Sequence, residues 1–445
     1  SRSYRYIIAN MNVTSALLHP MVTTISKKLD AQLMHEILVE KPYRFTPPIT
    51  WHWPQRLLTR LGRFQQLIRK EHGIIDHECR HVDRLRASVD AGHGIMLTPN
   101  HPRTTDPIAM YFLCREAPIS MYTMASWHLF NQSAFKTFMV RLMGAFSVNR
   151  EGLDRAAVDY AVKVLVEAER PLLIFPAGAT SRTNDRLMAL MEGPGFIART
   201  AAKKRAKNGQ KVVVHPIAIK YLYQGDIEKT GNEVLTDLER KLTWNPDPTV
   251  PLMERIIKLG NAVLTLKELE FNVQSMPGKT LRERQNNMVD HLMFPLEKEW
   301  LGATEPISGG IQSRVKNLRM KIFPEMSRDE IDQTEKDRRW QQLSQTYLAQ
   351  QIDCYPENYI VDLPSIDRLI DTLEKFEEDL IGQCRIHGKT KVILDVGEAI
   401  EVSPKRDRNA KSDPLMAAIR EQLNGSLAEL QHESRMYEGK IYGQH

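Results

Sequence analysis

Short apolar runs alternate with amphipathic stretches along the first half of the chain. Between residues 51 and 223 this pattern predicts helices over 82–91, 106–115, 129–142, 154–168 and 194–206. The runs between them predict strands over 95–98, 119–125, 145–148, 172–175 and 212–219. Regular alternation of helices and strands favours a largely parallel central sheet covered by helices, so the predicted fold class is α/β.

The pattern changes after residue 223. The chain from 224 to 388 is mainly helical and charged, with helices expected at 252–268, 281–300, 328–351 and 365–383. An apolar strand and turn at 391–400 and a terminal helix at about 414–432 follow. Residues 1–50 show mixed short patterns that end at a proline pair, and we interpret them as an N-terminal helical extension.

One polar motif follows the first buried strand directly: Asn100-His101-Pro102-Arg103-Thr104-Thr105-Asp106. On a loop that leaves a strand, a histidine five residues before an aspartate can lie beside the carboxylate. The imidazole then serves as a base and the carboxylate orients it. Of the 14 histidines, only His101 has an aspartate at this spacing. The motif therefore indicates acyl-transfer chemistry.

Three later segments add candidate binding residues. Gly144–Arg150 is typical of a short strand that delivers an arginine to its carboxyl end, where open α/β sheets bind ligands. The planar guanidinium of Arg150 suits a phosphate, because it donates two parallel hydrogen bonds. Leu172–Arg182 reads as a buried strand that breaks into a small-residue turn with hydroxyls and a second arginine. Val212–Ile219 is a fourth apolar strand.

These four blocks, in this order, resemble the glycerolipid acyltransferases, the glycerol-3-phosphate and 1-acylglycerol-3-phosphate acyltransferases with an N-H-x-x-x-x-D motif. The resemblance covers about residues 85–223. It implies transfer of a fatty acyl group, in phospholipid synthesis, from acyl-coenzyme A or an acyl carrier protein to lysophosphatidate or glycerol 3-phosphate. His101 would be the general base and Asp106 would hold its imidazole. The resemblance implies no metal and no cofactor beyond the thioester co-substrate.

The resemblance also implies an acceptor site. Arg150 is the first candidate for the acceptor phosphate, and Ser181 and Arg182 are the secondary candidates. Gly178 would allow close approach of the backbone at the turn, and Asn100 is assigned to substrate binding with the first block.

The same resemblance bears on the domain boundaries. In the family, a strand similar to the 391–400 run closes the catalytic sheet. We therefore expect this run to be the returning edge of the catalytic domain. That domain would comprise 51–223 and 389–445, and 224–388 would be an insertion.

The third block departs from the family pattern. Ala177, Ala179 and Thr180 stand where the family normally carries glutamate, threonine and arginine. Either Arg182 takes over the phosphate, or the acceptor differs, or activity is impaired. The alternative function is accordingly an acyltransferase-like lipid-binding or scaffolding protein with weak or no activity.

Composition narrows the class of protein and the compartment in which we expect it. The 445 residues are 42% hydrophobic and 26% charged, which are ordinary globular values. The four cysteines form no C-x-x-C pair, so we expect a reducing, cytoplasmic compartment. No apolar run reaches the roughly 18 residues of a spanning helix, and no signal peptide is evident. The cluster Asp76–His81 lacks a second pair of metal ligands and is interpreted as a solvated helix face.

Two basic stretches suggest partners. Residues 51–70 carry five basic and no acidic residues, with Leu57, Leu61, Phe64 and Ile68 on one expected helical face behind Trp51 and Trp53. This segment fits either the cytoplasmic face of a membrane, as a peripheral protein, or an ordinary surface helix. Residues 199–220 carry seven basic residues, which either attract the phosphates of the donor or form a solvated face. No nucleic-acid-binding signature and no G-x-S-x-G hydrolase elbow accompany them.

Overall fold

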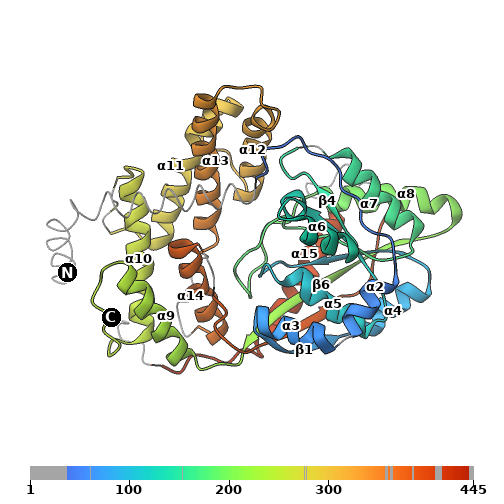
Figure 1. Ribbon diagram of the computed structural model, residues 1–445, viewed down its shortest axis with the longest axis horizontal. Helices are drawn as coiled ribbons and strands as arrows, with labels where there is room; N and C mark the ends of the chain where they lie inside the picture. The colour runs from blue at the N-terminus through green and yellow to red at the C-terminus, as the bar shows by residue number, and fades with distance from the viewer. Residues whose placement is uncertain are drawn as a thin grey trace.

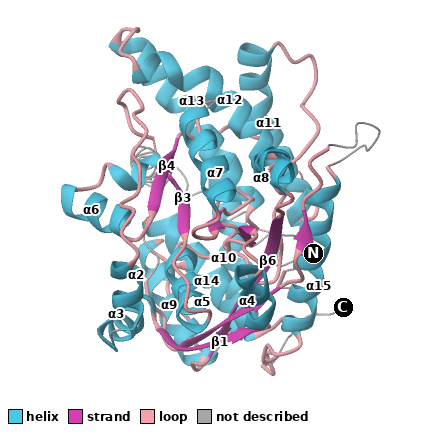
Figure 2. Ribbon diagram, turned by 90° about the vertical axis from the view of Figure 1, so that its right-hand side faces the viewer, coloured by secondary structure: helices cyan, strands magenta, loops and turns pink. Residues whose placement is uncertain are grey.

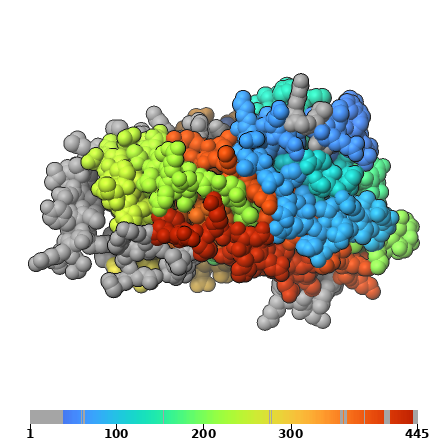
Figure 3. Space-filling model, turned by 90° about the horizontal axis from the view of Figure 1, so that it is seen from below, coloured from blue at the N-terminus to red at the C-terminus, as the bar shows by residue number. Residues whose placement is uncertain are grey.

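The computed structural model describes residues 38–60, 62–152, 154–274, 276, 278–355, 359–360, 364–382, 385–405 and 413–439. A sheet covered by helices lies beside a second region, which we call the helical region. After the helical region, the C-terminal segment of the chain returns to the sheet (Figures 1 and 3). Residues 1–37 of the expected N-terminal helical extension lie outside the described residues. The remainder, 38–50, contains no helix.

Eight strands form one sheet, in the order β1-β7-β6-β2-β5-β3-β4, and β8 pairs with β6. All pairs are parallel except those of β6 with β7 and with β8. The prediction of a largely parallel α/β sheet is therefore confirmed. The strands are β1 (Ile74–Arg80), β2 (Gly94–Pro99), β3 (Tyr122–Ser126), β4 (Ala145–Val148), β5 (Leu172–Leu173), β6 (Val212–Tyr223), β7 (Thr390–Val396) and β8 (Ile400–Glu401).

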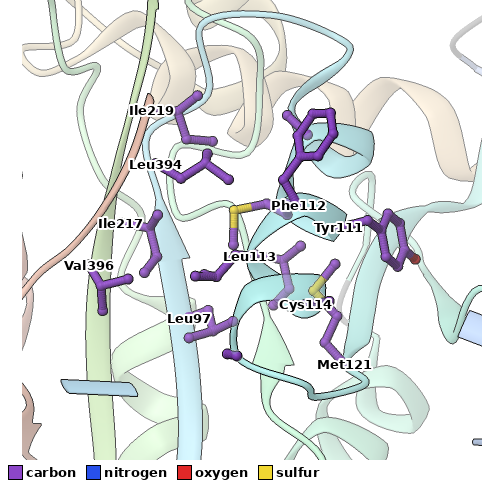
Figure 4. Close-up of a cluster of buried hydrophobic side chains, with 14 of the residues drawn as sticks. Leu97, Tyr111, Phe112, Leu113, Cys114, Met121, Ile217, Ile219, Leu394 and Val396 are labelled. Carbon is purple, nitrogen blue, oxygen red and sulfur yellow. The ribbon is translucent and has the colours of Figure 1, made fainter. Parts of the chain in front are cut away.

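Helices cover both faces of the sheet. The core on one face joins β2, β6 and β7 to α3, α4 and α5, and Figure 4 shows Leu97 and Leu394 facing Leu113 of α5. The core on the other face packs α7, α8 and α15 on the same sheet. The helices of this unit are α2 (Trp53–Arg60), α3 (Gly62–His72), α4 (Val82–Asp90), α5 (Asp106–Glu116), η1 (Trp127–Phe130), α6 (Ala134–Leu142), α7 (Arg155–Glu167), α8 (Gly193–Arg205), η2 (Ala206–Asn208) and α15 (Pro414–Gln431).

The helical region has two cores of its own. One packs α11, α12 and α13 together, and the other packs α9, α10 and α14. The third predicted helix starts later than expected, because the Asp332 carboxylate caps it by accepting from the Glu335 amide. The helices are α9 (Ile227–Lys241), α10 (Leu252–Glu270), α11 (Leu281–Leu301), α12 (Ile311–Ser327), α13 (Gln333–Asp353) and α14 (Ile366–Ile381).

Two interpretations made from the sequence are wrong, and both concern residues that form strands. The polar cluster at Asp76–His81 is not a helix face, because residues up to Arg80 form β1, an edge strand, and edge strands tolerate polar side chains. The 391–400 run contains β7, which lies inside the sheet between β1 and β6 and is not its edge.

The apolar stripe expected along 57–68 is found only in part. Phe64 and Ile68 pack in the core, and Leu61 lies outside the described residues. The Leu57 side chain is 48% exposed, whereas Ile68 is 1% exposed and packs in the core under the sheet.

A substitution that creates a cavity can test whether β7 lies inside the sheet. Leu394→Ala should lower the free energy of unfolding by about 2–5 kcal/mol, because it removes a fully buried side chain from the main core. Urea denaturation measures this change. Ile386→Ala, at a half-exposed position just before the strand, should change stability by no more than about 0.5 kcal/mol. Equal, small effects at both positions would show that β7 does not belong to the core.

Candidate active site

The two central residues of the first motif are in direct contact. His101 follows β2, and Asp106 is the first residue of α5. The His101 Nδ1 atom is 2.7 Å from Asp106 Oδ2. The imidazole also stacks on the Phe175 ring, with centroids 4.0 Å apart. Because a carboxylate oxygen accepts the hydrogen bond, Nδ1 is the donor and the lone pair is left on Nε2.

Asp106 is fully buried and accepts from three donors. Besides His101, these are the Arg103 amide at 2.9 Å and the Tyr221 hydroxyl at 2.6 Å. Burial, and after it the charge of Asp106, raise the pKa of Tyr221 well above its ordinary value, so this hydroxyl stays protonated and donates. Hydrogen bonds to both of its oxygens therefore hold the carboxylate in place before any substrate binds.

Asn100 and Ser181 hold the His101 loop in place. The Asn100 side chain is 2% exposed, and its amide group bonds both the N–H and the carbonyl of Ile219, at 2.7 and 2.9 Å. The Ser181 amide donates to the His101 carbonyl at 2.7 Å, and its hydroxyl donates to the Thr183 carbonyl. Both side chains are used internally. These bonds position the His101 loop, and the expected role of both residues in substrate binding stays a prediction.

Arg150 and Gly178 meet at the turn after β5. The backbone of Gly178 has a φ of +70°, which a residue with a side chain rarely adopts. Its carbonyl accepts from Arg150 Nη1 at 3.0 Å. The Arg150 Nε atom is buried and has no hydrogen-bond partner among the residues that the structure describes. Since Ala177 supplies no carboxylate here, this guanidinium keeps donor capacity beside the His101 turn.

The other two arginines near His101 are neutralised by α14 of the helical region. Arg103 bonds Asp371 and Glu374, each at 3.1 Å. Arg182 pairs with Glu378. These groups line a small pocket of about 10 Å³ beside the His101 loop. Because the Arg182 guanidinium already pairs with the Glu378 carboxylate, Arg150 is the better placed of the two arginines predicted to bind phosphate.

Asp371 is the central group of this contact. Besides Arg103, its carboxylate accepts from the Tyr359 hydroxyl at 2.7 Å and from the Asn184 amide at 2.9 Å. Burial raises the pKa of Asp371 to about 7. The helical region is therefore joined to the first and third blocks through a buried carboxyl group.

A second cavity, of about 140 Å³, opens between the third block and the helical region. Ser181, Leu187 and Met188 line one side of it, and Arg282, Ile311 and Asp353 line the other. It mixes apolar and charged groups, as sites for amphipathic ligands do.

Exposed aromatic side chains gather on one side of the sheet unit, where α2 and α6 project together (left in Figure 2). We call this set the aromatic surface; it comprises Trp51, Trp53, Leu57, Phe135 and Phe138. The Ile49 amide and the Arg141 guanidinium join the two segments through backbone carbonyls. Trp53 is 62% exposed and Phe135 is 73% exposed. Trp51 and Trp53 stack on one another, with ring centroids 6.4 Å apart, and large exposed apolar side chains that gather on one side are typical of interaction surfaces.

The second basic stretch is only partly a surface feature. Arg199 pairs with Asp413, Arg205 bonds three backbone carbonyls, and Lys220 pairs with Asp185 inside the sheet unit. Lys203, Lys204 and Lys207 remain exposed. Lys211 is also exposed and pairs with Glu401.

Sequence reasoning missed three residues of the site: Arg103, Tyr221 and Asp371. Arg103 lies inside the first motif, and its position there was the available signal. Tyr221 was missed because the fourth strand continues to Tyr223, beyond its expected end at 219. No feature of the sequence indicates which acid of the helical region meets Arg103.

The part of the chain that contains the His101 motif is similar to known proteins. Residues 77–220 match the acyltransferase family. A similar protein is the 1-acyl-sn-glycerol-3-phosphate acyltransferase of Streptococcus pneumoniae, 27% identical over 161 residues. The similarity covers 33% of this chain and 59% of that enzyme, so the chain spans less than two thirds of the length of this relative. Within the described residues, no helix is both long enough and apolar enough to cross a membrane.

Because of Asp371, the free energy of unfolding should fall as the pH rises toward neutrality. Its carboxyl has an ordinary pKa of 3.8, and in the folded protein a pKa of about 7. Between these values the folded state binds more protons than the unfolded state, so the free energy of unfolding decreases with increasing pH. Asp371→Asn, which does not titrate, should flatten that part of the profile.

Urea denaturation across this pH window measures the effect. Asp159→Asn, an exposed position on α7, is the matched control and should leave the slope as in the wild type. An unchanged slope in Asp371→Asn would mean that Asp371 is not protonated in the folded protein.

Proposed function

We propose that this chain, whose residues 77–220 match the acyltransferase family and which is similar to a 1-acyl-sn-glycerol-3-phosphate acyltransferase, transfers a fatty acyl group from an acyl thioester to a glycerolipid hydroxyl in phospholipid synthesis. The acceptor is lysophosphatidate or glycerol 3-phosphate, and the donor is acyl-coenzyme A or an acyl carrier protein. The observation that carries this proposal is the 2.7 Å contact between His101 Nδ1 and Asp106, inside the matched residues.

The reaction is a direct transfer. His101 Nε2 takes the proton of the acceptor hydroxyl while the oxygen attacks the thioester carbonyl carbon. The tetrahedral intermediate then collapses, the C–S bond breaks, and the imidazolium returns the proton to the leaving sulfur. Asp106 keeps the imidazole in the required tautomer and stabilises the imidazolium. Tyr221 and the Arg103 amide hold Asp106 in turn.

The binding groups follow from the charges around this pair. Arg150 is assigned to the acceptor phosphate, because its Nε has no partner and Arg182 is already paired with Glu378. The exposed lysines of the second basic stretch, Lys203, Lys204 and Lys207, are assigned to attracting the phosphates of the donor.

The aromatic surface is assigned to the cytoplasmic face of a membrane, where a lysophospholipid acceptor resides. Its tryptophans and phenylalanines suit the interfacial layer, and the exposed Arg56 and Arg60 of α2 suit anionic headgroups. The protein would bind the membrane peripherally, with the aromatic side chains inserted.

Loss of the base tests the reaction. His101→Ala should lower the rate of acyl transfer by about a hundred- to ten-thousand-fold, since no other group takes the hydroxyl proton. Thiol release from a long-chain acyl-coenzyme A, with lysophosphatidate and glycerol 3-phosphate tried separately, measures the rate. His432→Ala removes an exposed histidine at the end of α15 and should be as active as the wild type. Equal rates for His101→Ala and the wild type would refute the assigned base.

Membrane binding is tested separately from activity. Trp53→Ser and Phe135→Ser should each weaken binding to phosphatidylglycerol-containing vesicles by about ten-fold, because burying an aromatic side chain contributes about 1.5–3 kcal/mol. Co-sedimentation measures the binding. Phe196→Ser is the matched control, since Phe196 is 59% exposed but lies on α8, which covers the opposite face of the sheet. A control as impaired as the other two variants would argue against the aromatic surface.

A further inference from the structure

Of the three described donors to Asp106, Tyr221 alone lies outside the His101 loop. Its hydroxyl donates to Asp106 Oδ1 at 2.6 Å, a short bond of the kind that a charged oxygen accepts. Tyr221 is 2% exposed and belongs to the buried strand β6. Any effect of this hydroxyl on the reaction must therefore pass through Asp106, because a substrate at His101 has no access to a side chain so deeply buried.

The bond from Tyr221 bears on the strength of the base. A donor to a carboxylate stabilises its negative charge and disperses it. In the proposed reaction Asp106 stabilises the imidazolium that forms when His101 Nε2 takes a proton. A carboxylate that is shared with a tyrosine stabilises the imidazolium less. The imidazole then stays unprotonated to lower pH and remains available as a base.

Tyr221 is held from several sides. The Asn184 side chain bonds the Tyr221 main chain in both directions: Oδ1 accepts from the N–H at 2.8 Å, and Nδ2 donates to the carbonyl. The guanidinium carbon of Arg103 lies 5.0 Å from the centroid of the Tyr221 ring, within the range of a cation–π contact. The Thr105 hydroxyl is 3.3 Å from the Tyr221 hydroxyl. The ring is thus fixed in the place from which it reaches Asp106.

One carboxylate of the helical region joins two of these supports. Asp371 accepts from the Arg103 guanidinium at 3.1 Å and from the Asn184 amide at 2.9 Å. Because the Arg103 amide donates to Asp106, the contacts form a closed circuit. It runs from Asp106 through Tyr221, Asn184, Asp371 and Arg103 back to Asp106. A displacement of Tyr221 would disturb the whole circuit.

Most charged groups around this circuit are paired with one another. They are Arg182 and Asp185 after the third block, Lys220 on β6, and Asp367, Arg368, Glu374 and Glu378 on α14. Arg150, on the loop after β4, bonds the Gly178 carbonyl, and the titratable Tyr359 hydroxyl bonds Asp371. Removal of the Tyr221 hydroxyl changes none of these charges, so its effect on the base can be measured alone.

We propose that Tyr221 is a positioning residue that sets the pH range in which His101 acts as a base. Its hydroxyl shares the Asp106 carboxylate with the imidazole, and Asn184 keeps the hydroxyl in place. This inference rests on the proposed function, since it concerns the base of the proposed reaction.

The pH profile of kcat/KM tests the assignment. Tyr221→Phe removes the hydroxyl and keeps the ring. With lysophosphatidate as acceptor, the acidic limb of the profile should move to higher pH by about one unit. Below the limb the value should fall about ten-fold, whereas the plateau at higher pH should stay within about three-fold of the wild type. A residue that only supports the fold would lower the plateau and leave the limb in place.

Tyr355→Phe is the matched control. The Tyr355 hydroxyl also donates to a carboxylate, that of Asp379 at 2.5 Å, but both residues belong to the helical region. This variant should keep the limb and the plateau of the wild type, and circular dichroism checks that each variant is folded.

A double variant tests the role of Asn184. Asn184→Ala should move the acidic limb in the same direction as Tyr221→Phe, because the tyrosine loses its main-chain support. Adding Asn184→Ala to Tyr221→Phe should move the limb no further, since both changes act through one hydrogen bond.

NMR separates this inference from the proposed function. The imidazole of His101 would be titrated in protein with ¹⁵N-labelled histidine, with His101→Ala used to assign its signals. The midpoint should lie at higher pH in Tyr221→Phe than in the wild type. A midpoint that moves in this way, in a protein that transfers no acyl group, would retain the inference and refute the proposed function.

Three outcomes overturn the inference. One is an acidic limb and an NMR midpoint that stay in place in folded Tyr221→Phe. Another is movement of either to lower pH. The third is an equal movement in Tyr355→Phe, which would show that the effect does not pass through Asp106.

Discussion

The buried carboxylate of Asp106 is the point on which the site depends. A fully buried acid is stable only if its oxygens are bonded, and here three parts of the chain supply the donors: the His101 loop, the backbone of Arg103 and Tyr221 on β6. The loop after β2 and the long central strand are thereby fixed to one another. The same bonds that satisfy the carboxylate also orient the imidazole, so folding itself would prepare His101 for the proposed role of base.

The helical region is coupled to this centre by charge. α14 contributes carboxylates to Arg103 and Arg182. These ion pairs offset positive charge beside the His101 loop. They also join a helix outside the matched residues to the first and third blocks.

Local pattern was enough to predict much of the sheet and the contact between His101 and Asp106. β2, β4 and β6 are continuous apolar runs, and the motif spacing placed His101 beside Asp106. Polar strands were missed, because β1 lies at an edge where its side chains meet water. Asn100 was assigned to substrate because a buried amide that bonds the neighbouring strand has no sequence signature. The partners of Arg103 and Arg182 lie about 190 to 270 positions away, beyond any local pattern.

The central claim is acyl transfer to a glycerolipid hydroxyl, and product identification tests it most directly. The purified chain would be incubated with isotope-labelled acyl-coenzyme A and lysophosphatidate in vesicles, and the lipids analysed by mass spectrometry. The account predicts labelled phosphatidate and free coenzyme A in equal amounts, both dependent on the acceptor. Labelled free fatty acid in place of phosphatidate, or no release of coenzyme A with this acceptor or with glycerol 3-phosphate, would contradict it.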